Sequence, residues 1–409
     1  MSDKPTLLFV STRFLFPVDS GGKIRTTQVL RGLTGGKFRV VLVSPASASL
    51  VAEHGEDLAR VCDRFEWWPE PARGPLFELT RLRHLPDPLP VPVRTDCHPG
   101  AVEKIATLLA EQPAVAVYDF AHAAVLADFP LPVPSVMFTH NVEAEIFRRH
   151  RDVATNPIKK AIWANQYRKM QRFERDSLRR FDVVVAVADR DSEQFARDYG
   201  VGGSHIIPTG VDLDFFSYHA PERDHEIVFC GSMDWMANQT GIEYYMNEIW
   251  PLIAAEEPDT KMTVVGRSPP ERMLNAASQK GLNWTFTGFV DDVRDYMSGA
   301  AVSVIPLTVG GGTRLKAYEA MSAGNPIVST SIGIEGLPVV PEQHYLNADT
   351  PNEFAAAVVR LIRDRGLRVR IAQAARQHVE ENFSYTVAAE SFEQACERAI
   401  GRFETHQVA

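Results

Sequence analysis

The chain has 409 residues, of which 45% are hydrophobic and 23% charged, and its formal net charge is −9. This length favours two or three domains, the composition excludes a disordered chain, and the acidic balance excludes nucleic acid as the main partner. No apolar stretch approaches the roughly 20 residues that span a bilayer. The four cysteines lie far apart, which favours free thiols in a reducing compartment, so we expect a cytoplasmic protein.

Apolar runs rich in β-branched residues alternate with helical patterns along the first half of the chain. Continuously apolar runs are typical of parallel strands that helices cover on both faces. The predicted strands are Thr6–Thr12, Phe38–Ser44, Ala114–Asp119, Val133–Thr139 and Asp182–Ala188. The segment Trp67–Thr95, rich in proline and arginine, breaks the pattern and is predicted to be an excursion from the first domain.

A long helix is predicted over Ile158–Phe181, and it carries many basic residues. The favoured interpretation is a solvated basic face with an apolar face packed inward, and the alternative is adsorption to an anionic membrane surface. The predicted inward residues are Ile162, Tyr167, Met170, Phe173 and Leu178.

The second half repeats the alternation of strands and helices, which predicts a second doubly wound sheet. Its predicted strands are Glu226–Cys230, Lys261–Val265, Trp284–Thr287, Ala301–Pro306 and Pro326–Ser329. Its predicted helices are Gly241–Ile253, Pro269–Lys280 and Asn352–Arg363. A polar, proline-containing segment at Pro208–Asp224 reads as a linker between the two domains. Ligands of such sheets bind beyond the carboxyl ends of the strands, so we expect the site in a cleft between the domains.

Charge differs between the halves. Residues 1–208 hold 27 Lys or Arg against 25 Asp or Glu, whereas the remainder holds 16 against 27. The two halves therefore face different surroundings.

The most informative stretch is 310–328, in which Gly310, Gly311 and Gly312 follow a predicted strand and open a helix. Glycines let a ligand approach the backbone, and a helix N-terminus attracts anions. Arg314 and Lys316 would add positive charge for a diphosphate, and Glu319 would accept hydrogen bonds from sugar hydroxyls. The alternative is a glycine-rich turn with Thr313 capping the helix and a surface ion pair.

Several stretches in order resemble the retaining glycosyltransferases of family 4, which have the GT-B architecture of two Rossmann-like domains facing a cleft. The closest resemblance is to a bacterial subgroup associated with exopolysaccharide and exosortase loci. The stretches are 21–25, 139–143, 207–216, 229–235, 287–290 and 310–328. The resemblance implies an acceptor domain at 1–208, completed by a C-terminal helix at 384–409, and a nucleotide-sugar donor domain at 209–383.

The resemblance also implies roles for individual residues. His140 would contact the transferred sugar or stabilise charge at its reacting carbon, and Glu319 would bind the ribose. The amides of Arg314 to Lys316 would hold the phosphates. The implied catalytic residues are His140, Arg314, Lys316 and Glu319. The implied donor-binding residues are Gly21, Gly22, Gly231, Gly266, Arg267, Gly288, Phe289, Val290, Gly311, Gly312, Thr313 and Leu315.

The chain departs from the family pattern at two places. Gly311 stands where the first glutamate of the E-x7-E pair is expected, and no Arg or Lys occurs in the 231–238 loop. We therefore expect Arg314 and Lys316 to supply the missing positive charge.

Other polar residues are interpreted structurally. Glu143 and Glu145 are expected to be solvated, and Asp212 and Asp214 to cap a turn rather than bind a metal. A structural, hydrogen-bonded role remains the alternative for His140. No metal and no cofactor are expected.

The resulting hypothesis is a metal-independent transferase that moves a sugar from a nucleoside diphosphate sugar, with UDP the expected nucleotide, to a hydroxyl acceptor in the biosynthesis of a polysaccharide, glycolipid or metabolite. Peripheral membrane contact at the inner face is an open alternative for its location. The alternatives for activity are a nucleotide-sugar 2-epimerase and a catalytically silent homologue that acts as a binding partner. A dehydrogenase is disfavoured, because no G-x-G-x-x-G follows the first strand.

Overall fold

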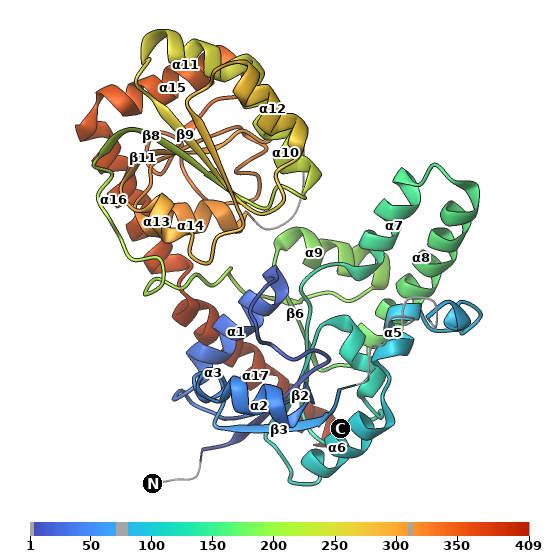
Figure 1. Cartoon of the computed structure of the whole chain (residues 1–409). Helices are drawn as coiled ribbons and strands as arrows, with labels where there is room; N and C mark the ends of the chain where they lie inside the picture. The colour runs from blue at the N-terminus through green and yellow to red at the C-terminus, as the bar shows by residue number, and fades with distance from the viewer. Residues whose placement is uncertain (1–3, 71–80, 310–313, 409) are drawn as a thin grey trace. The chain divides into compact units, whose positions relative to one another are not determined.

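The structure is a computed structural model that describes residues 4–70, 81–309 and 314–408 (Figure 1). Contacts divide the chain into two units. Unit 1 is Met1–Gly210 with Tyr385–Ala409, and unit 2 is Val211–Ser384. In the part of the chain that is described, no helix is long and apolar enough to cross a membrane.

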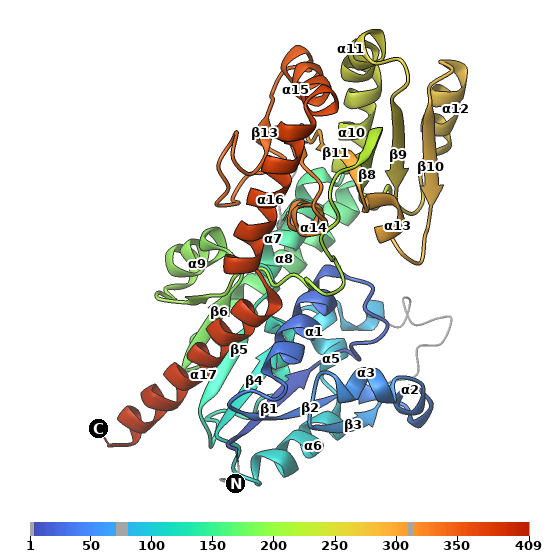
Figure 2. The same cartoon turned by 90° about the vertical axis from the view of Figure 1, so that its left-hand side faces the viewer.

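Within the described residues, unit 1 is built on a seven-stranded parallel sheet with the order β3-β2-β1-β4-β5-β6-β7 (Figures 1 and 2). The strands are β1 (Thr6–Ser11), β2 (Arg39–Ala46), β3 (Arg64–Pro69), β4 (Val115–Asp119), β5 (Ser135–Phe138), β6 (Val183–Ala186) and β7 (His205–Ile206). The helices are α1 (Gly21–Leu33), α2 (Ala48–Glu53), α3 (Gly55–Ala59), α5 (Val91–Asp96), α6 (Pro99–Leu109), α7 (Glu143–Val153), α8 (Pro157–Leu178), α9 (Asp189–Gln194) and α17 (Tyr385–Val408), with 3-10 turns at Leu82–His84 and Ala121–Leu126 and a π turn at Phe195–Tyr199.

Helices cover both faces of this sheet, which explains why its strands are apolar on both sides. Successive side chains of β1 point to opposite faces. Leu7 and Phe9 join a buried cluster with α1 and α17, whereas Leu8 and Val10 join a second cluster with α6 and the end of α8. The last helix of the chain is therefore part of the core of unit 1.

In the described part of unit 2, six parallel strands follow the order β10-β9-β8-β11-β12-β13. They are β8 (Arg223–Cys230), β9 (Lys261–Val265), β10 (Trp284–Gly288), β11 (Ala300–Ile305), β12 (Ile327–Ser329) and β13 (Leu346–Asn347). The helices are α10 (Met236–Tyr244), α11 (Trp250–Glu256), α12 (Glu271–Gln279), α13 (Arg294–Met297), α14 (Leu315–Ala323), α15 (Pro351–Arg363) and α16 (Arg365–Asn382), with a π turn at Tyr245–Ile249. The predicted α/β fold with two Rossmann-like parallel sheets is confirmed.

Three local predictions differ from the structure in part. Trp67 to Pro69 is not the start of an excursion, because it pairs with β2 as the end of β3. The helix predicted at 241–253 is helical throughout, but it begins earlier, at Met236, and contains a π turn at Tyr245–Ile249, just before Pro251, whose missing amide cannot donate in an α-helix. The segment expected to be a linker packs into unit 2 from Val211 onward, and Phe216 is buried in its core.

Candidate functional site

The carboxyl ends of three strands in unit 2 meet at glycines. Gly231 follows β8, Gly266 follows β9, and Gly288 ends β10. The amide of Gly231 donates to the carbonyl of Val265 at 2.9 Å, and Gly266 forms a β-bridge with Gly288. Ligands of open parallel sheets bind at this edge. The structure therefore brings together three of the predicted donor-binding residues.

Close contacts explain why two of these positions are glycine. A Cβ atom at Gly266 would lie 2.0 Å from the carbonyl oxygen of Gly231, which as a backbone atom has little freedom to move. A Cβ atom at Gly231 would lie 2.9 Å from Nδ2 of Asn238 and 3.0 Å from Nζ of Lys316. The absence of side chains thus lets the backbone of the first loop lie against the ammonium group of Lys316.

Lys316 lies in the first turn of α14, and its charged end is surrounded by protein atoms. Its Nζ donates to Oδ1 of Asn238 at 2.6 Å and lies 4.5 Å from the centre of the Phe229 ring. Burial lowers the pKa of Lys316 to about 8, although the nearby Glu319 carboxylate raises it. The amine therefore holds its proton less tightly than an exposed lysine does, and a neighbouring anion would strengthen that hold.

Glu319 lies three residues further along α14, on the same face as Lys316. Burial raises the pKa of Glu319 to about 7, and the positive charge of Lys316 only partly offsets this. The two residues thus form a cation and a carboxylate, each in surroundings that disfavour its charge. Such a pair suits a ligand that carries both a phosphate and hydroxyl groups.

Arg314 directly precedes the same helix, but its side chain is buried and points to the backbone of the loop after β12. Its Nη2 donates to the carbonyl of Ile332 at 2.7 Å and lies 3.7 Å from the Glu335 carboxylate. Burial lowers the pKa of Arg314. This geometry fits a residue that holds the loop after β12 in place. The predicted contact of the Arg314 side chain with a diphosphate stays a prediction.

The other predicted residues of unit 2 differ in exposure. Arg267 is exposed and donates to Oγ of Ser232 and Oδ2 of Asp234, at 3.0 and 3.1 Å. Phe289 is 74% exposed directly after β10, whereas Val290 packs against a small apolar cluster. Exposed Phe289 offers a ring face at the carboxyl edge of the sheet.

Leu315 is the first residue of α14 and is partly buried. Gly311, Gly312 and Thr313 were predicted to bind the donor, and they lie outside the described residues.

In unit 1 the predicted residue His140 follows β5 and is only 3% exposed. Its Nε2 lies 2.7 Å from Oδ1 of Asp119, at the end of β4, and its Nδ1 lies 3.5 Å from Nη1 of Arg25. A carboxylate accepts and a guanidinium donates, so the protein groups favour a neutral imidazole with its proton on Nε2. Burial lowers the pKa of His140 in spite of the opposing effect of Asp119.

Gly21 and Gly22 open α1, and Gly22 lies under an aromatic ring. A Cβ atom at Gly22 would lie 2.4 Å from Cζ of Phe120. The Phe120 ring in turn stacks on the imidazole of His140, with 4.0 Å between ring centres and 17° between planes. Phe120 also has a φ of +66°, which a non-glycine residue rarely adopts. The stack thus gives a structural reason for the glycine at position 22.

Sequence reasoning missed two residues that organise this part of unit 1, Asp119 and Phe120. Asp119 is fully buried and accepts hydrogen bonds from Oγ1 of Thr26, at 3.2 and 3.1 Å, and from Oγ of Ser11 at 3.3 Å. Phe120 holds the imidazole from one side. Only one signal was available, an aspartate at the end of a predicted strand next to the strand that carries His140.

Glu143 and Glu145 were expected to be solvated, and this expectation is wrong, because both are less than 10% exposed. The carboxylate of Glu174 in α8 accepts the amides of Glu143 and Ala144, at 2.8 and 3.2 Å, and so caps α7. Burial raises the pKa of Glu174 to about 7. Sequence separation hides this contact, which joins residues 31 positions apart.

A second buried histidine lies near the start of α7. Nδ1 of His122 lies 3.1 Å from Oδ2 of Asp96, and its Nε2 lies 3.7 Å from Oε2 of Glu143. Burial disfavours the charged form, but the two carboxylates outweigh it and raise the pKa of His122. Unit 1 thus gathers two histidine–carboxylate pairs beyond the carboxyl ends of β4 and β5.

Asp212 behaves as predicted for a turn cap. Its Oδ1 accepts the amides of Asp214 and Phe215, at 3.1 and 2.9 Å. Among the residues that the structure describes, no group of three or more histidine, cysteine, aspartate and glutamate side chains is placed to hold a metal ion.

These features define an α/β protein with two Rossmann-like parallel sheets, and its second unit carries a buried lysine and glutamate one turn apart at the carboxyl edge of the sheet. Two protein-family models match the chain, one for each unit. Residues 20–215 match the model described as Glycosyltransferase Family 4, and residues 224–364 match Glycosyl transferases group 1. The matches and the fold together support a glycosyltransferase of the GT-B type similar to family 4.

Individual relatives are distant. The chain is 25% identical over 235 residues to the MMP alpha-(1->4)-mannosyltransferase of Mycolicibacterium hassiacum, which covers 55% of this chain and 56% of that protein. This chain spans only 56% of the length of that mannosyltransferase and 63% of the length of another curated relative, an uncharacterized protein of Klebsiella pneumoniae.

Two solved structures show the same fold over nearly their whole length. Sucrose-phosphate synthase from Thermosynechococcus elongatus superposes with a TM-score of 0.67 at 17% identity, covering 97% of this chain and 99% of the other. HepE of Anabaena, solved in complex with UDP, superposes with a TM-score of 0.66 at 14% identity, covering 96% and 99%.

The stack on Gly22 can be tested by substitution. We expect Gly22→Ala to lower the free energy of unfolding by about 1–3 kcal/mol, because the methyl group overlaps the Phe120 ring. Gly55→Ala, where the added atom meets nothing within 4 Å, is the matched control. Urea unfolding of both variants measures the difference.

The same substitution in a Phe120→Ala background isolates the contact. There the Gly22→Ala change should cost clearly less, because the overlapping ring is gone. An equal cost in both backgrounds would show that the ring does not constrain position 22.

Proposed function

We propose that the protein is a glycosyltransferase that moves a sugar from a nucleoside diphosphate sugar to a hydroxyl acceptor. The observation that carries this proposal is the pair formed by Lys316 and Glu319, one turn apart on α14 at the carboxyl edge of the unit 2 sheet. Lys316 and the amides at the start of α14 would stabilise the diphosphate, which is the leaving group. Glu319 would accept hydrogen bonds from ribose hydroxyls.

UDP is the nucleotide that we propose for the donor. Structures of HepE, which share the fold, were solved in complex with UDP and with UDP-glucose. At the edge of the unit 2 sheet, Gly288 ends β10 and exposed Phe289 follows it, and these two residues would contact the base.

The resemblance to family 4 supports transfer with retention at the anomeric carbon. Retention would follow if the acceptor attacks from the side on which the diphosphate leaves, with a phosphate oxygen taking the acceptor proton. In that arrangement the chain supplies positioning and charge stabilisation, and its own residues form no covalent intermediate. We also propose a cytoplasmic location and a product in polysaccharide, glycolipid or metabolite biosynthesis.

Substitutions on α14 test the donor site. We expect Lys316→Met and Glu319→Gln each to weaken UDP binding about 10- to 100-fold, because the first removes a charged donor and the second replaces a charged acceptor by a neutral one. Isothermal titration calorimetry measures the affinity, and Lys280→Met, at an exposed lysine of the same unit, is the control. The donor site lies elsewhere if both α14 variants bind UDP as the unsubstituted protein does.

A turnover assay with the best nucleotide sugar then separates the activities. Release of UDP with transfer to an acceptor, and loss of that release in Glu319→Gln, supports the transferase. Conversion of the donor without an acceptor identifies an epimerase instead, and binding without turnover across many donors identifies a silent homologue.

The pKa values of the pair predict how UDP affinity depends on pH. Below about pH 7 Glu319 takes up a proton and loses the negative charge that strengthens its hydrogen bonds with hydroxyl groups, and above about pH 8 Lys316 loses its charge. Affinity should therefore be highest between about 7 and about 8 and fall on both sides. Calorimetry across this range measures the profile.

Two variants test which residue causes the fall in UDP affinity at each end of the pH range. Glu319→Gln should remove the fall on the acidic side, and Lys316→Arg should move the fall on the alkaline side upward, because a guanidinium stays charged. A profile that is the same in both variants would contradict the assignment.

We also propose that catalysis needs no divalent metal. Lys316 and the start of α14 supply positive charge to the phosphates, while Asp212 is engaged in a turn. Transfer rates should stay unchanged after dialysis against EDTA. A loss of rate that Mg²⁺ or Mn²⁺ restores would show that a metal takes part.

A further inference from the structure

Exposed apolar side chains gather at the tip of the hairpin formed by α7 and α8 in unit 1. Val153 ends α7 and is 77% exposed, and Ile158 lies in the first turn of α8 and is 70% exposed. Asn156 fixes the turn between them, because its Oδ1 accepts the amides of Ile158 and Lys159 at 2.9 and 3.1 Å. Two large aliphatic side chains with this exposure, one before and one after a capped turn, indicate a contact surface.

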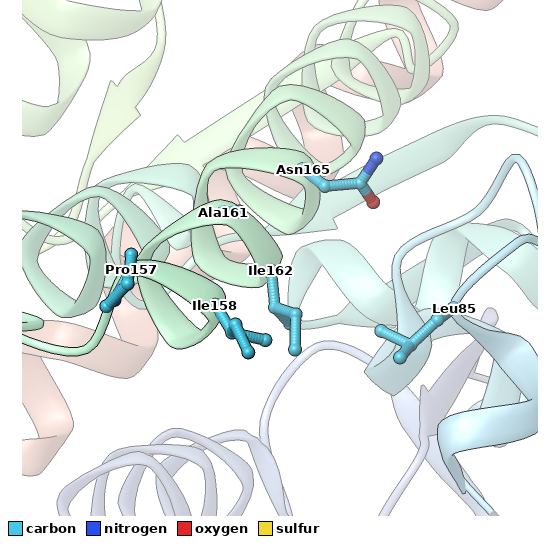
Figure 3. A pocket seen from close by; sticks show the side chains of 6 residues that line it. All are labelled: Leu85, Pro157, Ile158, Ala161, Ile162 and Asn165. Carbon is cyan, nitrogen blue, oxygen red and sulfur yellow. The ribbon is translucent and has the colours of Figure 1, made fainter.

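A shallow groove of about 490 Å³ runs along α8 from this tip. It is lined by Leu85, Pro157, Ile158, Ala161, Ile162 and Asn165. Figure 3 shows the side chains of Ile158 and Ile162 on one face of α8, with Leu85 of the neighbouring segment facing the same space. Leu82, one turn before Leu85, is 54% exposed. The apolar surface thus continues from the turn onto the adjacent segment.

Basic residues surround this apolar surface. Between residues 146 and 172 the chain has eight Lys or Arg and a single acidic residue, although its net charge is −9. Lys159 and Lys160 directly follow the exposed Ile158, and both are exposed. Arg168 is also exposed, and its Nε donates to the main-chain carbonyl of Ala164 at 3.3 Å. Arg148 and Arg149 pair with Glu145, and Arg151 pairs with Asp152. The positive charge nearest the protruding apolar side chains therefore comes from Lys159 and Lys160.

We propose that this hairpin surface, defined by Leu85, Val153, Ile158, Lys159 and Lys160, docks on an anionic lipid bilayer. Apolar side chains that enter the interface and cations that meet anionic headgroups are the two contributions that hold a protein on a membrane surface. A neutral groove would suit an apolar protein partner, but the local excess of cations in an acidic chain is complementary to an anionic surface. Interleaved aliphatic residues distinguish the surface from a nucleic-acid site.

The way in which α8 packs on unit 1 leaves the first turns of the helix exposed. Met170 and Leu178, further along the helix, are buried, whereas Ile162 is only partly buried and Ile158 extends beyond the core. The basic helix therefore packs on unit 1 through its second half and presents its first turns to the surroundings. Docking through them involves unit 1 alone and does not depend on the donor site in unit 2.

Co-sedimentation of the full chain with vesicles tests the proposal. The protein should bind vesicles that contain phosphatidylglycerol and not vesicles of phosphatidylcholine alone, and added salt should weaken the binding by screening. Each basic residue near the surface contributes about a fivefold effect, so Lys159→Gln with Lys160→Gln should weaken binding about 25-fold. The matched control is Lys261→Gln with Lys280→Gln, a pair of exposed lysines in unit 2.

The apolar contribution has its own variant and its own readout. Ile158→Ser should reduce vesicle binding, whereas Leu252→Ser, at a half-exposed leucine of unit 2, should not. An environment-sensitive dye on Val153→Cys should shift to the blue with anionic vesicles, and the same dye on Val340→Cys should not. Unchanged thermal unfolding of each variant shows that the fold is retained.

Three results would overturn the proposal. The first is the absence of binding to anionic vesicles at low salt, and the second is equal binding by the lysine variant and its control. The third is concentration-dependent self-association that Ile158→Ser abolishes while vesicles bind neither form, which would assign the surface to a second copy of the chain.

Discussion

The approach of two backbone segments in unit 2 sets the geometry on which the candidate donor site depends. Gly266 and Gly231 lie so close that any side chain at Gly266 would overlap a carbonyl oxygen. Because the loop after β8 is drawn inward in this way, the ammonium group of Lys316 lies beside it and donates to Asn238. A wider spacing would admit water around the ammonium group and return its pKa toward that of an exposed lysine.

In unit 1 a glycine again permits a close contact, but the contact has a different consequence. Gly22 makes room for the ring of Phe120, and that ring covers the imidazole of His140. The Asp119 carboxylate fixes the orientation of the imidazole through a hydrogen bond, and the hydroxyl groups of Thr26 and Ser11 donate to the same carboxylate. Here the glycine produces a rigid, buried hydrogen-bond network rather than an open edge. Any role of His140 in chemistry would therefore be exerted from a fixed position with a neutral ring.

The sequence predicted the fold well where strands are buried on both faces. The prediction for β4, at 114–119, differs from the strand by one residue at its start, because all five residues of this strand are buried and four of them form an apolar run. It missed β3, an edge strand that pairs on one side only, because the alternation of polar and apolar residues from Arg64 to Trp67 lasts only four residues and ends at Trp68 and Pro69. A strand of two residues such as β13 carries no periodicity at all.

The positions of the candidate site residues could be predicted, but the directions of their side chains could not. Lys316 and Glu319 share a helix face because of their spacing, which the sequence contains. Arg314 is two residues away from Lys316, and its side chain turns to the carbonyl of Ile332, 18 positions further along the chain. The buried contacts of Asp119 and Glu174 depend likewise on which strands and helices become neighbours, and local sequence does not record this.

The distribution of charge along the chain relates the candidate donor site in unit 2 to the basic α7–α8 hairpin of unit 1. From residue 209 onward acidic residues outnumber basic ones by 27 to 16, so the long-range field opposes the arrival of an anionic nucleotide. Binding must then rely on short-range groups: a lysine whose hold on its proton strengthens beside a diphosphate, and the amides at the start of a helix. The basic residues that would attract an anion from a distance are concentrated instead on the α7–α8 hairpin. This separation of charge fits the two proposed roles. The basic α7–α8 hairpin would meet an anionic membrane surface, whereas the candidate donor site on α14 would select a single nucleotide by short-range contacts.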